Sequence, residues 1–169
     1  MPAMTSHIPP FCQLPLEPAP LQLPGARLVR ASFDPARLAA EDFQRCAIEP
    51  VRGVAKRQGE YLAGRLCARE ALRQLCGQAL VPGRDEDGVP IWPAGVIGSI
   101  THGAGQAAAM VASRQDWQGL GLDLEKQLSA ERAAKLAGEI LTPAETERAE
   151  GLDPQAFARL VTLTFSLKE

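Results

Sequence analysis

Two carboxylates lie two residues apart in Gly121-Leu122-Asp123-Leu124-Glu125, where polar and apolar residues alternate. On a β-strand, residues two apart point to the same face and lie roughly 6.6 Å apart along the chain. Asp123 and Glu125 would then share one face, with leucines packed behind them. Hard cations such as Mg²⁺ prefer oxygen ligands and often share them with substrate phosphates, so the segment predicts a magnesium site. An ordinary amphipathic edge strand shows the same alternation, and that interpretation stays open on this segment alone.

A second group of chemically useful side chains is Gly98-Ser99-Ile100-Thr101-His102. Glycine lets a ligand approach the backbone closely, and hydroxyl and imidazole groups bind phosphate oxygens. The segment therefore predicts a phosphate contact. A lone histidine in a turn is also a common surface residue, so the alternative remains.

The last segment with possible chemistry is Phe165-Ser166-Leu167-Lys168-Glu169. A helical Glu beside a Lys is usually a solvated pair worth a few tenths of a kcal/mol, roughly. This segment by itself predicts no site.

Charge is balanced over the whole chain but uneven along it. The chain has 18 Lys and Arg against 20 Asp and Glu, a net charge of -2, which argues against a nucleic-acid partner. Basic residues gather between Arg45 and Arg73, and acidic residues gather after Asp116. This distribution suits a site that binds an anion and a metal together, although two solvated helix faces would produce it as well.

The four cysteines, Cys12, Cys46, Cys67 and Cys76, are not spaced as zinc ligands, and only two histidines accompany them. We therefore expect free thiols in a reducing cytoplasm. The proline-rich segment up to Gly25 has neither a basic start nor a long apolar run, so we expect neither a signal peptide nor a membrane span.

Proline and glycine positions predict the elements of the first part of the chain. Residues 1–33 contain many prolines and are expected to be irregular or edge structure. The longest helix is expected to begin at Glu49-Pro50 and to end at Gly77. A loop is expected at residues 83–95.

Apolar periodicity predicts the remaining elements. Short apolar runs predict strands at residues 96–101, 107–112 and 120–125. Helices are expected at residues 130–141 and 143–150, and a last one from Asp153, with apolar side chains as far as Leu167 facing a core.

In combination the segments are much more specific than any one of them. Five blocks follow in order, at residues 55–72, 90–95, 98–102, 121–125 and 165–169. Their order and spacing resemble those of the 4′-phosphopantetheinyl transferases of the surfactin-synthetase-activating type. The chain looks closest to the branch that serves enterobactin synthetase and related siderophore systems. The resemblance covers residues 45–169.

The resemblance implies an enzyme that moves 4′-phosphopantetheine from coenzyme A to a serine of an acyl or peptidyl carrier protein and releases adenosine 3′,5′-bisphosphate. Such enzymes serve siderophore, nonribosomal peptide or fatty acid synthesis. It also implies Mg²⁺ held by Asp123, Glu125 and Glu169, with Glu169 as the base for the carrier serine. Lys168 and His102 complete the implied catalytic set.

Coenzyme A contacts are implied as well. Thr101 and His102 match the positions that touch its phosphates. The basic residues in the segment that holds the 3′-phosphate end are Arg52, Lys56, Arg57 and Arg65, and the sequence leaves open which of them touches it. Members of the family often have a basic residue where this chain has Val89.

The implied fold is α+β, a pseudo-dimer of two similar α+β halves. Residues 1–118 would form the first half with the coenzyme A-binding elements, and residues 119–169 would begin the second half with the metal-binding acids. The family motif continues past Glu169, so we expect a C-terminally truncated chain with an incomplete second half. The alternative is an inactive fragment that only binds coenzyme A or the carrier protein. We expect a monomer.

Overall fold

The computed structural model describes residues 7–17 and 22–169. The chain forms two compact units, unit 1 up to Leu122 and unit 2 from Asp123 to Glu169. Unit 2 begins four residues after the position where the second half is expected to begin, and the division into two family halves stays a prediction. The mixture of helices and antiparallel strands confirms the α+β fold class.

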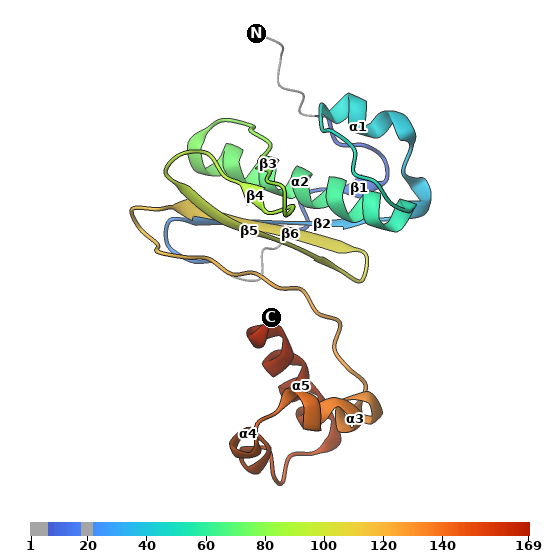
Figure 1. Ribbon diagram of the computed structural model, residues 1–169, viewed down its shortest axis with the longest axis vertical. Coiled ribbons are helices and arrows are strands. Elements are labelled where there is room, and N and C mark those ends of the chain that lie inside the picture. The colour runs from blue at the N-terminus through green and yellow to red at the C-terminus, as the bar shows by residue number, and fades with distance from the viewer. Residues whose placement is uncertain (1–6, 18–21) are drawn as a thin grey trace. The chain divides into compact units, whose positions relative to one another are not determined.

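Unit 1 is built on a four-stranded antiparallel sheet with the strand order β1-β2-β6-β5 (Figure 1). The strands are β1 Cys12–Gln13, β2 Ala26–Phe33, β5 Val96–Gly103 and β6 Gln106–Ser113. The two strands predicted after residue 95 are confirmed, and they form a hairpin in which Gly103 pairs with Gln106. Ala104 and Gly105 form its turn with φ of 50° and 74°, the positive values that a tight two-residue hairpin turn needs.

The expectation of irregular or edge structure for residues 1–33 is wrong for β2. This strand pairs with β1 on one side and with β6 on the other. The prolines stop at Pro24, and beyond them Val29, Ala31 and Phe33 alternate toward the core. The many prolines predict irregular structure only for the part of the segment that contains them. The alternating apolar residues after Pro24 predict a strand.

Helix α2, Ala55–Cys76, lies along one face of this sheet (Figure 1). Its side chains at Leu62, Leu66 and Leu72 are buried among residues of β2 and β6. The predicted end at Gly77 is confirmed, because this residue has the left-handed conformation that favours glycine. The predicted start at residue 50 is wrong, because Gly53 interrupts helical geometry with a φ of 141°.

Smaller elements surround α2. A 3-10 turn, η1 Pro35–Arg37, and helix α1, Ala40–Cys46, precede it. In the predicted loop at residues 83–95, β3 Gly83–Arg84 pairs with β4 Pro90–Ile91. Among the residues described, no helix has the length and apolar content needed to cross a lipid bilayer.

Unit 2 contains three helices around a small apolar core. They are α3 Ala130–Ile140, α4 Pro143–Arg148 and α5 Pro154–Lys168. The predicted helix starts at residue 143 and at Asp153 are confirmed, and both helices are capped by the side-chain oxygens of Thr142 and Asp153, which accept backbone N–H groups of the first helical turn. The core is formed by Ala133, Leu141, Ala158 and Val161.

Two expectations for unit 2 and the segment before it are wrong. Residues 120–125 do not form a strand, because within the described ranges no neighbouring strand pairs with them and a strand requires such a partner. Leu167 does not face a core, since 86% of its surface is exposed. The apolar packing of α5 ends near Val161, nearly two helical turns before Leu167, so the apolar pattern of the helix extends beyond its buried face.

Candidate functional site

A cavity of about 150 Å³ lies in unit 1 beside the N-terminal half of α2. Helix α2 supplies Arg57, Glu60, Tyr61 and Arg65, which are spaced i, i+3, i+4 and i+8 and therefore share one helix face. Strand β5 supplies His102 and Ile100, and the β3–β4 hairpin adds Gly88 and Pro90. The cavity thus brings together three of the basic side chains predicted from sequence.

Arg65 is the most informative side chain of this cavity. It is only 4% exposed, and its guanidinium carbon lies 4.9 Å from the centroid of the Tyr61 ring. Its Nε and Nη1 atoms are buried and donate to no acceptor in the described part of the chain. A buried donor without a partner costs about 1–3 kcal/mol of stability and is rare in native proteins, so two of them in one side chain indicate a ligand that accepts their hydrogen bonds. Its planar fork matches a phosphate or carboxylate.

His102 and Glu60 face each other across the cavity. The Nδ1 atom of His102 lies 3.7 Å from Oε2 of Glu60. This contact is an ion pair when the imidazole is protonated. It orients the imidazole ring and leaves Nε2 as the ring nitrogen that does not face Glu60. The carboxylate also offsets part of the positive charge of Arg57 and Arg65 when no anion is bound.

Glu60 and Tyr61 are residues of the cavity that were not predicted from the sequence. The signal was present, because both fall on the helix face that carries Arg57 and Arg65. Helical spacing along α2 therefore predicts that Glu60 and Tyr61 lie beside these two arginines.

The remaining coenzyme A residues predicted from sequence lie outside this cavity. Thr101 is 9% exposed and points to the opposite face of β5 from His102, since neighbouring strand residues alternate. Arg52 lies before α2 and Lys56 lies in its first turn, and both are exposed. Their roles remain predictions.

Gly98 has a packing role in this structure. A Cβ atom there would lie 2.6 Å from Cζ2 of Trp92, closer than any real contact. The indole of Trp92 therefore covers the backbone of β5 at Gly98. The missing side chain of this glycine makes room for Trp92 rather than for a ligand.

The three acids predicted to bind metal all belong to unit 2. Ser166 Oγ donates a hydrogen bond of 2.7 Å to Oδ2 of Asp123. Partial burial raises the pKa of Glu125, and the negative charges of Asp123 and Glu169 raise it further. The carboxylate of Glu125 therefore lies within electrostatic range of both other acids.

Carboxylate oxygens are the donors that Mg²⁺ takes, so the chemistry of this set fits the ion. Within residues 7–17 and 22–169, however, no group of three His, Cys, Asp or Glu side chains is assembled at metal-binding distances.

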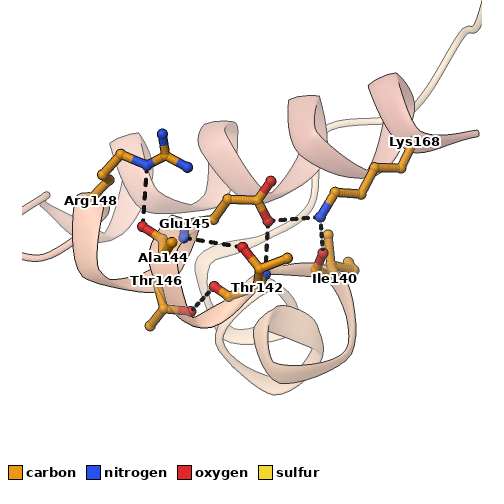
Figure 2. Close-up of polar contacts among 7 residues, drawn as sticks. All are labelled: Ile140, Thr142, Ala144, Glu145, Thr146, Arg148 and Lys168. Atoms are coloured by element: carbon orange, nitrogen blue, oxygen red, sulfur yellow. Dashed lines mark hydrogen bonds and ion pairs between the residues drawn. The ribbon is translucent and has the colours of Figure 1, made fainter.

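Lys168 is held by contacts within unit 2. Its Nζ donates 2.7 Å to Oε2 of Glu145 and 2.8 Å to the carbonyl oxygen of Ile140 (Figure 2). The hydrogen bond from Lys168 and that from the backbone N–H of Thr142 lower the pKa of Glu145 to about 2. Glu169, the next residue, is exposed at the end of α5.

Residues 45–112 match the family described as the 4′-phosphopantetheinyl transferase N-terminal domain. Enterobactin synthase component D of Escherichia coli strain K12 is 40% identical over 153 residues, which cover 88% of this chain and 70% of that protein.

The chain belongs to the 4′-phosphopantetheinyl transferase family.

Two further relatives, matched over a shorter segment, support the assignment. The 4′-phosphopantetheinyl transferases Npt of Nocardia iowensis and PptT of Mycobacterium tuberculosis are each 42% identical over 74 residues, 44% of this chain and 33% of each relative. The matched family domain contains α2 and both strands of the β5–β6 hairpin, and with them the Arg57, Arg65 and His102 side chains of the cavity. The resemblance inferred from the five sequence blocks is thereby confirmed.

Proposed function

We propose that this phosphopantetheinyl transferase moves 4′-phosphopantetheine from coenzyme A to a serine hydroxyl of an acyl or peptidyl carrier protein. The names of its relatives support transfer of this group. The observation that carries the proposal is the buried guanidinium of Arg65, which has donors without acceptors in a cation-lined cavity. A phosphate group supplies the acceptors that this side chain lacks.

Arg57, Arg65 and His102 hold a phosphate of coenzyme A in this proposal, with the terminal 3′-phosphate as the best candidate. A phosphate monoester carries about two negative charges near neutral pH. The cavity offers two guanidinium groups and an imidazole against one carboxylate, that of Glu60. Arg52 lies just before the same helix and Lys56 lies in its first turn, and both add positive charge for the rest of the ligand.

In the proposed reaction, the serine oxygen attacks the phosphorus atom that carries the pantetheine arm. The bond from this phosphorus to the bridging oxygen breaks, and adenosine 3′,5′-bisphosphate leaves with the electron pair. Glu169 takes the serine proton as general base. Asp123, Glu125 and Glu169 are the residues that would hold Mg²⁺. The bound ion would neutralise the negative charge that develops on the diphosphate.

Two finer points belong to the same proposal. The similarity to enterobactin synthase component D favours a siderophore or related peptide pathway. All four cysteines are free, which favours a reducing compartment such as the cytoplasm.

The test is intact-mass measurement of an apo carrier protein after incubation with the 169-residue chain, coenzyme A and Mg²⁺. We expect the carrier to gain the mass of one phosphopantetheine, and to gain nothing when EDTA replaces Mg²⁺. Asp123→Asn and Glu125→Gln are expected to abolish the gain, whereas the matched control Glu131→Gln, an exposed acid of the same unit, keeps it.

Two results would count against the proposal. Binding of coenzyme A without any mass gain would support the alternative of a binding fragment. An absence of both binding and mass gain would refute the assignment of the cavity as well.

A further inference from the structure

The last turn of α5, which carries Glu169, is fastened at two points. On one side, Ser166 donates to the carboxylate of Asp123 at 2.7 Å. On the other, Lys168 donates to the carbonyl oxygen of Ile140 at the end of α3 and to the carboxylate of Glu145 in α4. The backbone N–H of Glu169 completes the turn with a bond of 3.1 Å to the carbonyl of Phe165.

Glu145 is well placed to hold this turn because its own carboxylate is fixed. Its Oε2 accepts the backbone N–H of Thr142 at 2.7 Å, and its own N–H donates to the Thr142 hydroxyl at 3.3 Å (Figure 2). This reciprocal capping box orders the carboxylate before any lysine binds. The ordering cost that weakens most surface ion pairs is therefore reduced here.

Lys168 uses both a charge and a backbone acceptor in this contact. Its ammonium group has three donors, and two of them are taken by Glu145 and by the carbonyl of Ile140. An extended lysine in two hydrogen bonds fixes its own helical turn. The neighbouring Glu169 shares that turn.

We propose that Glu145 is a positioning residue, which holds Lys168 and thereby fixes the end of α5 and the carboxylate of Glu169. In this arrangement Lys168 is a tie between helices and makes no contact with substrate. The expected effect on kcat rests on the proposed function. The expected ordering of the end of α5 does not depend on it.

Two conservative substitutions test the tie in the full chain. Glu145→Gln keeps an acceptor for Thr142 and removes the charge, while Lys168→Met keeps the aliphatic stem. We expect the amide of Glu169 to exchange with solvent about twofold to fivefold faster in each variant, the range that a partly exposed ion pair supports. Lys168→Met also removes the hydrogen bond to the carbonyl of Ile140, so the double variant is expected to exchange no faster than Lys168→Met alone, because that substitution already removes the ion pair with Glu145.

The kinetic consequence is a split between kcat and KM. Misplacement of a reacting group by about 1 Å costs up to roughly a hundredfold in rate. We expect Glu145→Gln to lower kcat about tenfold and to leave the KM for coenzyme A unchanged, since the cavity of unit 1 is untouched. Glu131→Gln removes a pair of similar length on α3, at 2.6 Å to Lys135, and is expected to change neither quantity.

The outcomes separate the two proposals. Faster exchange in a chain that transfers nothing supports the tie and counts against the proposed function. Unchanged exchange in both variants, or exchange effects that add in the double variant, overturns the tie. A lysine that contacts substrate would instead raise the KM of Lys168→Met and leave the exchange of the Glu169 amide unchanged, which also overturns it.

Discussion

Replacing Arg65 by Met separates a ligand-binding arginine from a structural one, because the two roles predict opposite effects on stability. Methionine fills much of the volume of the arginine stem and has no donors. In the wild-type chain, Nε and Nη1 of Arg65 are buried without acceptors in the described part of the chain. Each such donor costs about 1–3 kcal/mol. The contact with the Tyr61 ring returns roughly 0.5–2 kcal/mol.

With two such donors, the balance predicts that Arg65→Met leaves the free energy of unfolding unchanged or raises it by up to about 5 kcal/mol. For a chain of this size each kcal/mol moves Tm by roughly 2–4 °C. Binding is expected to change in the other direction. Loss of one charge-assisted hydrogen bond, worth about 1.5–3 kcal/mol, weakens the Kd for coenzyme A roughly 10- to 150-fold.

The assay combines thermal unfolding with calorimetric titration of coenzyme A and of coenzyme A without its 3′-phosphate. We expect the wild-type chain to prefer the first ligand and Arg65→Met to bind both with similar Kd. Arg73→Met is the matched control, since Arg73 lies on the same helix and is exposed in a surface pair with Glu70.

Two results would refute this reasoning. A loss of more than about 2 kcal/mol in the free energy of unfolding would make Arg65 a structural residue. An equal loss of affinity for both ligands would show that Arg65 does not hold the 3′-phosphate.

Three further predictions concern packing, thiol reactivity and pH. Gly98→Ala is expected to lower the free energy of unfolding in urea by about 1–3 kcal/mol, because the new methyl group meets the Trp92 ring, whereas Gly138→Ala in open space stabilises α3. At neutral pH a maleimide is expected to label Cys76 alone in the folded chain, because the other three thiols are buried and burial raises their pKa; labelling of four in the native state would contradict this. Because the pKa of Glu145 falls from 4.5 to about 2 on folding, its contribution to stability is present above about pH 4.5 and is lost as the pH falls toward 2. The Tm difference between wild type and Glu145→Gln should therefore shrink over that interval, and a constant difference would argue against the tie.

Local chemistry explains the predictions that the structure confirms. The caps at Thr142 and Asp153 and the helix end at Gly77 depend on hydrogen bonds and φ values within a few residues, so the sequence contains all the information required. The β5–β6 hairpin is equally local, because its two strands are joined by the two residues Ala104 and Gly105.

The wrong predictions concern partners distant in sequence. Residues 26–33 form a strand because β1 and β6 pair with them, and residues 120–125 form none because the described chain offers no neighbouring strand. Alternation of polar and apolar residues is a property of the segment, whereas strand pairing is a property of the fold.

For the candidate site, the amino-acid sequence by itself determined which functional groups are present, since residue type fixes the charge, the donors and the metal preference of each side chain. Only the tertiary structure decided that Arg65 is buried without acceptors, that Glu60 faces His102, and that Lys168 is tied to Glu145. These outcomes depend on packing of α2 against β5, and of α5 against the α3–α4 connection. Contacts between such distant segments arise from the joint burial of many apolar side chains, and no single segment encodes them.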